Sequence, residues 1–334
     1  MKKYVSIALI AASAFAAEGY KVLNKIQIGG MGGWDYVTLD NTNRRLYVSH
    51  GTAVEVVDPD AGKVVGQIPG LHGVHGIAVA AELNRGFITN RTTNSVTVFD
   101  LKSLQKTGEP AAGKNPDAIC YDPKTKRIVA MNHSGNDATV IDANTNEIVA
   151  TLPLGPAPEF CAADGAGKMY VNLEGSSETV EIDVAKPEVT RRVSLAPAEG
   201  PTGLAIDLKN RKLFAACSGS KQLAVIDIAS FRVVATPATG AGADGAGFDS
   251  GNGLAFSSNG DGTLTLVKAV NGKYETVDTV QTERGARTMT VDEKLHRVYL
   301  LAAEYGQPAE AKEGVKKGPP PIKQDTFHVL VVGK

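Results

Sequence analysis

Seven polar or charged side chains that could bind a ligand or take part in a reaction recur at nearly constant intervals along the chain. Successive members lie 40, 42, 42, 43, 42 and 43 residues apart: Asp35, His75, Asp117, Glu159, Thr202, Asp244 and Arg287. Carboxylates and imidazoles are common metal ligands, and a guanidinium can hold an anionic group. A fold that brings these positions together would form a ring able to bind a metal ion or a polar ligand.

The histidines narrow the metal hypothesis to one sector of this ring. The chain has six: His50, His72, His75, His133, His296 and His328. The repeat places His50 and His133 on the same face as His75, and it places His296 on the opposite face. Imidazole combined with carboxylate suits zinc, copper or iron better than calcium. We therefore predict one transition-metal ion bound by His50, His75, His133, Asp117 and Glu159.

The same positions allow other interpretations. A small polar ligand would contact Trp34, Asp35, Asp117, Thr202, Asp244 and Arg287. A metal-assisted hydrolase or lyase, or a copper-type redox enzyme, would use His75, His133 or Glu159 as base or ligand and Arg287 as the anion holder. The alternative without a binding role is a set of polar residues at a solvent-filled channel mouth, with Trp34 packed in the core. No Ser-His-Asp arrangement or G-x-S-x-G motif supports nucleophilic catalysis.

Short strands in a repeat of about 42 residues must position these side chains. An acid closes the first strand of most repeats: Asp40, Asp122, Asp164, Asp207, Asp249 and Asp292, with Ala80 in the second repeat. The fourth repeat predicts strands at 159–164, 168–173, 179–184 and 189–195. Four short strands in about 42 residues are typical of a propeller blade. Seven repeats predict an all-β, seven-bladed β-propeller over residues 17–334 as a single domain.

The two ends of the chain complete this prediction. The seventh repeat lacks a fourth strand, and residues 20–28 offer one beside the third strand at 327–333. Such a closure removes the open sheet edges of the ring. Residues 303–325 form a long loop inserted in the seventh blade, on the ring face, which we expect to be a mobile segment or a lid.

The ends of the second strands carry a resemblance to a known family. The stretches YVSH (47–50), FITN (87–90), VAMN (129–132) and FSSN (256–259) resemble the YVTN-type β-propeller repeat family, which includes YncE-like exported propeller proteins. The resemblance extends over residues 17–334 and implies the propeller fold without naming an activity. We expect the repeat asparagines Asn90, Asn132 and Asn259 to stabilise turns through their side chains.

Composition and the N-terminal residues suggest where the protein works. Residues 1–16 have the basic start, short apolar run and small-residue cleavage site of a signal peptide, so we expect a periplasmic or secreted protein. The formal net charge of −1 argues against a general nucleic-acid binder. We expect no transmembrane segment and a monomer. The three cysteines, Cys120, Cys161 and Cys217, are expected to be buried small side chains, since their odd number predicts no disulfide framework.

These observations favour an exported binding protein that presents the ring to a small ligand, a metal ion or a partner protein. The metal-assisted hydrolase, lyase or redox enzyme is the alternative.

Overall fold

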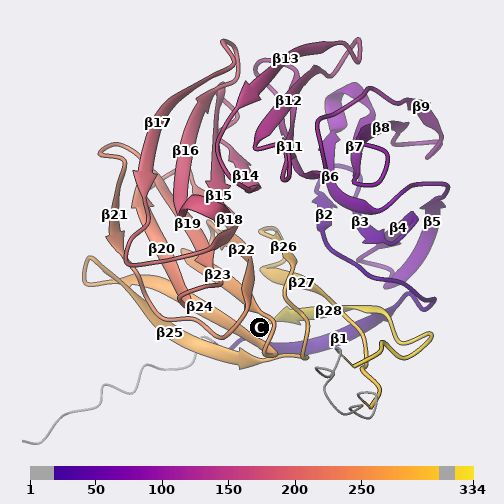
Figure 1. Cartoon of the computed structure of the whole chain (residues 1–334). Coiled ribbons are helices and arrows are strands. Elements are labelled where there is room, and N and C mark those ends of the chain that lie inside the picture. The colour runs from indigo at the N-terminus through magenta and orange to yellow at the C-terminus, as the bar shows by residue number, and fades with distance from the viewer. Residues whose placement is uncertain (1–18, 308–319) are drawn as a thin grey trace, which may run out of the picture.

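The computed structural model describes residues 19–307 and 320–334. Within these residues the chain forms seven four-stranded antiparallel sheets arranged as blades around a central axis (Figure 1). This confirms the predicted seven-bladed β-propeller. The predicted signal peptide and residues 308–319 of the 303–325 loop lie outside the described residues.

The strands follow the repeat, and each blade begins at the axis. Blade one comprises β2 (Val37–Asp40), β3 (Arg45–His50), β4 (Ala53–Asp58) and β5 (Lys63–Ile68). Blade two comprises β6 (Val74–Ala80), β7 (Arg85–Asn90), β8 (Ser95–Asp100) and β9 (Lys106–Gly108), with the 3₁₀ turn η1 (Ala81–Leu83). Blade three comprises β10 (Pro116–Asp122), β11 (Arg127–Asn132), β12 (Asp137–Asp142) and β13 (Ile148–Pro153). Blade four comprises β14 (Pro158–Ala163), β15 (Lys168–Leu173), β16 (Glu178–Asp183) and β17 (Glu188–Ser194), with η2 (Glu174–Ser176).

The last three blades complete the ring. Blade five comprises β18 (Pro201–Asp207), β19 (Lys212–Cys217), β20 (Gln222–Asp227) and β21 (Arg232–Ala235). Blade six comprises β22 (Ala243–Asp249), β23 (Leu254–Asn259), β24 (Thr263–Val270) and β25 (Lys273–Gln281). Blade seven comprises β26 (Met289–Asp292), β27 (Arg297–Ala302), β28 (His328–Gly333) and β1 (Lys21–Gln27). The predicted closure is confirmed, because β1 pairs with β28 along its length, from Lys21 opposite Gly333 to Gln27 opposite His328 (Figure 1).

The apolar core lies between the blades. Seven clusters of buried apolar side chains each join two neighbouring blades, and one of them joins blade seven to blade one. A blade therefore buries its faces only against its two neighbours, so the ring must close for every face to be covered.

The repeated polar residues hold turns and strand pairs. Asp40 is buried, and its Oδ1 accepts hydrogen bonds from the backbone N–H groups of Thr42 and Asn43 in the following turn. The repeat asparagines differ from the prediction. Asn90 is fully buried, and its Nδ2 donates to Thr97 Oγ1 on the next strand at 2.9 Å. The equivalent bonds in blades three and six join Asn132 to Thr139 and Asn259 to Thr265. These asparagines bridge adjacent strands from a buried position, although Asn90 Oδ1 also accepts from the backbone of His72.

A disulfide joins two of the three cysteines, contrary to the prediction. Cys120 on β10 is bonded to Cys161 on β14, and Cys217 is a free, buried thiol. The bridge links the innermost strands of blades three and four. An odd number of cysteines leaves one thiol over but does not prevent the other two from pairing.

None of the helical segments among the described residues is long or apolar enough to cross a membrane.

Candidate functional site

Irregular pairing in the innermost strands turns the ring side chains toward the axis. On β6, Val74 pairs with Asn90 and the next pair is Ile77 with Ile88, so His75 lies outside the regular ladder. The same irregularity occurs at Asp117 on β10, Glu159 on β14, Thr202 on β18 and Asp244 on β22. Such a bulge redirects a side chain without breaking the strand.

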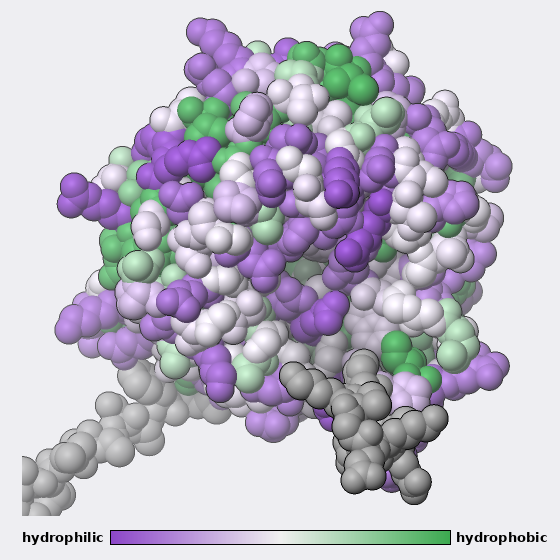
Figure 2. All heavy atoms as spheres, viewed as in Figure 1, coloured by the Kyte–Doolittle hydropathy of each residue, from purple (hydrophilic) through white to green (hydrophobic). Residues whose placement is uncertain are grey.

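Six of the seven ring residues line a cavity of about 170 Å³ at the axis. Its lining consists of Asp35, Tyr36, Asp117, Glu159, Thr202, Asp244, Arg287 and Thr288. Viewed along the axis, the ring has a central hollow bordered by hydrophilic residues (Figure 2). Four carboxylates share this small space with one guanidinium, which favours a cationic occupant.

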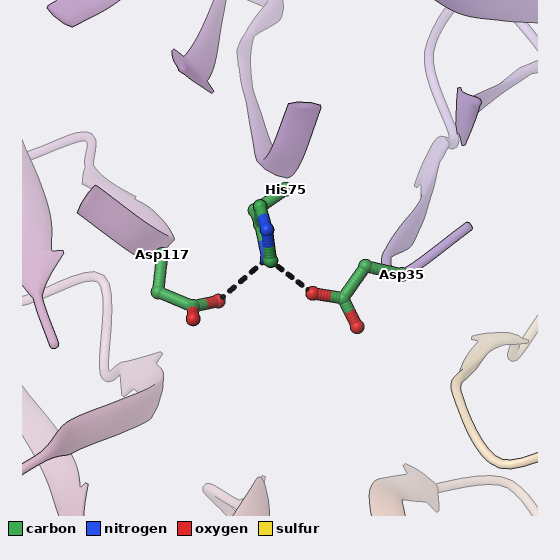
Figure 3. Close-up of side chains that lie close together, drawn as sticks. All are labelled: Asp35, His75 and Asp117. Carbon is green, nitrogen blue, oxygen red and sulfur yellow. Dashed lines mark ion pairs between the residues drawn. The ribbon is translucent and has the colours of Figure 1, made fainter. Parts of the chain in front are cut away.

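The first group of ligating side chains is Asp35, His75 and Asp117. The Nδ1 atom of His75 lies 2.5 Å from Asp35 Oδ2 and 3.3 Å from Asp117 Oδ1 (Figure 3). Burial lowers the pKa of His75, but the two carboxylates outweigh this effect and raise it to about 10. At neutral pH the imidazole of His75 is therefore a cation held between two carboxylates.

The second group is Asp117, His133 and Glu159. His133 follows the end of β11, and its Nδ1 lies 2.8 Å from Glu159 Oε1. The carboxylate of Glu159 raises the pKa of His133. Burial raises the pKa of Glu159 itself to about 7, although His133 opposes this shift. The ligand atoms of each group lie within 4.8 Å of one another, a spacing that would allow a metal ion between them.

Three polar atoms in these groups are buried without an aligned hydrogen-bond partner. They are His75 Nδ1, Asp117 Oδ1 and His133 Nδ1. Their separations from neighbouring oxygens are short enough for hydrogen bonds, but the ring N–H directions do not satisfy the geometry. Buried polar atoms without partners are costly in a folded protein, and a bound ion is one way to satisfy them.

The opposite side of the cavity has a different chemistry. Arg287 Nε lies 2.8 Å from Asp244 Oδ2, and its Nη2 lies 3.9 Å from Asp35 Oδ1. Burial raises the pKa of Asp244 to about 7 although Arg287 opposes it. Thr202 is buried, and its hydroxyl donates to backbone carbonyls of Ala216 and Ala243. Thr202 therefore supports the ring structurally, while the Asp244–Arg287 pair offers half-exposed polar atoms to the cavity.

Tyr36 belongs to the site but was not predicted. It lines the cavity, and its ring packs against Phe160 with centroids 5.4 Å apart. Burial and the surrounding carboxylates raise the pKa of its hydroxyl well above the usual range, so the phenol stays neutral. Phe160 lines a second cavity, of about 400 Å³, further along the channel. Tyr36 thus lines the acidic cavity and Phe160 the second one, and the contact between their rings lies where the two cavities approach each other.

The structure places His50 and Trp34 outside the two groups. His50 Nδ1 lies 3.2 Å from Glu55 Oε1, and its ring packs against Phe327 beside Gly30. His50 is therefore not brought together with His75 and His133 into one set of ligands. Trp34 stacks on Phe327 with centroids 5.0 Å apart. It also lines a separate cavity of about 190 Å³ with Gly33, Gly285, Arg287, Tyr305 and Ile322.

Two further histidines, His296 and His328, lie away from the ring residues. His296, in the turn between β26 and β27, has its Nδ1 2.8 Å from Asp249 Oδ2. His328 is buried on β28, near Glu283.

The charge of His75 makes the stability of the protein depend on pH. Its pKa is raised on folding, so its contribution to stability is complete below about pH 6.5 and is lost as pH rises through about 10. Asp35 and Asp117 face it directly, and Glu159, Asp244, His133 and Arg287 complete the charged surroundings. We expect the unfolding free energy of wild type to fall across this window and that of His75→Gln to fall less. An imidazole NMR signal of His75 that titrates near pH 6.5 would contradict this.

Comparisons with known proteins add a sequence family and a structural likeness. A family model described as a repeat of unknown function (DUF6923) matches residues 89–293. The chain is 25% identical over 169 residues to the uncharacterized protein YncE of Salmonella typhi and 24% identical to that of Salmonella typhimurium strain LT2. Each alignment covers 48% of this chain and 46% of the relative, so the match spans about half the length of these curated relatives.

Among solved structures, hydrazine synthase of Kuenenia stuttgartiensis is similar to this protein with a TM-score of 0.71. The superposition covers 81% of this chain and 92% of the other, at 16% sequence identity. At that identity the likeness concerns the fold alone.

Proposed function

We propose a function from the premise that this chain belongs to the family of the repeat of unknown function DUF6923, as a propeller with YncE-like sequence. The protein is a binding protein that holds a divalent transition-metal ion at the acidic mouth of its channel. The observation that carries this proposal is the convergence of buried, unaligned ligand atoms from His75, His133 and Asp117 beside a cavity lined by carboxylates, Asp117 among them.

The donor set indicates which metals would bind. Each group combines one imidazole nitrogen with two carboxylates, a set that suits zinc, copper or iron(II). Calcium prefers six to eight oxygen ligands, and neither group provides them. The protein would hold the ion through His75 or His133 and present it to the cavity.

We also propose that the protein works outside the cytoplasm. The Cys120–Cys161 disulfide supports this, since such bonds persist mainly in oxidising compartments. The apolar run and cleavage pattern of residues 1–16 support it independently.

Substitution of His75 tests the metal proposal. We expect His75→Gln to lower zinc affinity at least about 100-fold, because even residues that only orient a ligand cost 10–100-fold. Glutamine retains a neutral donor between Asp35 and Asp117, so the fold should survive. Calorimetric titration of metal-depleted protein measures the affinity, and circular dichroism checks the fold.

His296→Gln is the matched control, because His296 also contacts a carboxylate but lies away from the ring. Its zinc affinity should equal that of wild type. Wild-type protein that binds neither zinc nor copper above background, or equal losses in both variants, would refute the proposal.

One observation favours the metal-assisted hydrolase as a second candidate. Burial raises the pKa of Glu159, a shift in the direction that suits a general base near neutral pH, and Arg287 is half-exposed at the same cavity. Turnover of chromogenic esters or phosphoesters that requires the added metal and is lost in Arg287→Ala would favour this enzyme over a plain binding protein.

A further inference from the structure

The two histidine–carboxylate groups share one residue, Asp117. Asp35 and His75 lie on one side of it, and His133 and Glu159 lie on the other. Each side thus supplies one imidazole and one outer carboxylate. Figure 3 shows the first side, with His75 between the carboxylates of Asp35 and Asp117.

A single ion leaves half of these ligands unused. Zinc–ligand bonds are about 2.0–2.2 Å long, so the ligand atoms of one ion must lie close to one another. Only three of the five residues meet that requirement at a time, and Asp117 is the one member common to both sets.

We propose that the channel mouth holds two divalent transition-metal ions bridged by the carboxylate of Asp117. Asp35 and His75 complete the protein ligands of the first ion, and His133 and Glu159 complete those of the second. This inference rests on the proposed metal-binding function and specifies its stoichiometry and its bridging residue.

Burial supports two ions rather than one. The Asp117 residue is only 8% exposed, and its Oδ1 has no aligned hydrogen bond. An imidazole nitrogen is likewise unaligned in each group, His75 Nδ1 in the first and His133 Nδ1 in the second. One ion would satisfy the atoms on one side of Asp117 and leave, on the other, a buried imidazole nitrogen that has a carboxylate nearby but no aligned hydrogen bond.

Charge indicates what the pair of ions would bind next. Asp35, Asp117 and Glu159 supply three negative charges, and Asp244 is already paired with Arg287 at 2.8 Å. Two dications would therefore leave a net positive charge. The same three carboxylates line the cavity, so ions held by them would lie at its edge, within reach of a ligand in the cavity. A small anion such as hydroxide or a carboxylate is the class of ligand that fits there.

Copper titration tests the bridge. Metal-depleted full-length protein is loaded with Cu²⁺, passed through gel filtration, and analysed for copper content and by electron paramagnetic resonance. We expect two copper ions per chain with a spin-coupled signal. Asp35→Asn and Glu159→Gln should each retain one ion, with an uncoupled signal. Asp117→Asn should retain no more than one weakly bound ion.

His296→Gln is the matched control, since His296 also contacts a carboxylate, Asp249, but lies away from the ring. It should keep two coupled ions. Circular dichroism verifies the fold of each variant. If Asp117→Asn does not fold, the copper content and signal of Asp35→Asn and Glu159→Gln test the bridge. One ion in wild type, or two uncoupled ions that survive Asp117→Asn, would overturn the bridge while leaving the proposed function intact. No bound copper or zinc would refute both.

Discussion

A chain that starts at residue 29 should lose more than about 4 kcal/mol of unfolding free energy, an exceptionally large effect. The strand that it lacks, β1, is the outer strand of blade seven and covers the edge of β28. Ile26 on this strand is 1% exposed and belongs to the cluster that joins blade seven to blade one. Loss of β1 opens the ring, in which every blade packs against both of its neighbours. Urea unfolding, with gel filtration to detect aggregation at the exposed edge, measures the effect.

A chain that starts at residue 19 is the control, since it keeps all of β1. It should unfold like the full chain. Ile26→Asp should reproduce part of the loss by placing a charge in the same cluster. If the chains that start at 19 and at 29 have the same urea midpoint, β1 does not hold the ring closed.

Breaking the Cys120–Cys161 disulfide should cost about 4 kcal/mol, because the bond closes a loop of about 41 residues. We expect Cys120→Ser and Cys161→Ser to lower the urea midpoint equally. Addition of dithiothreitol should bring wild type to the same level and leave both variants unchanged. Alkylation followed by mass spectrometry identifies which thiols are free.

Cys217→Ala is the control for loss of a cysteine as such. Cys217 is buried and unbonded, so its substitution should cost far less and should keep the response to dithiothreitol. A response to reductant that is equally large in Cys120→Ser would show that the stability comes from elsewhere.

The repeat predicted the ring of seven residues, because residues one repeat apart in a propeller occupy the same position on the equivalent strand of successive blades. It could not give the distance of a side chain from the axis. His50 lies at the end of the second strand and packs outward against Phe327, whereas His133 lies one residue beyond its second strand and reaches Glu159. The repeat placed both on one face, and only the structure separates them.

Two features that were missed had a signal in the same repeat. The position after each ring residue is small in most blades, as at Gly76, where a Cβ atom would lie 2.6 Å from the Asp117 carbonyl oxygen. Tyr36 and Phe160 are the aromatic exceptions at this repeat position, and their rings contact each other across the channel. Cys120 and Cys161 lie about one repeat apart on adjacent innermost strands, a spacing compatible with a bond.

The Tyr36–Phe160 contact brings two aromatic rings together across the channel, one from blade one and one from blade four. Tyr36 lines the acidic cavity and Phe160 lines the second cavity, so the contact lies where the two cavities approach each other. For an occupant that enters and leaves by the acidic mouth, arrival and departure share one opening. Anything that settles over that opening would slow exchange in both directions equally and leave the equilibrium affinity of the trapped occupant unchanged unless it also touches the occupant.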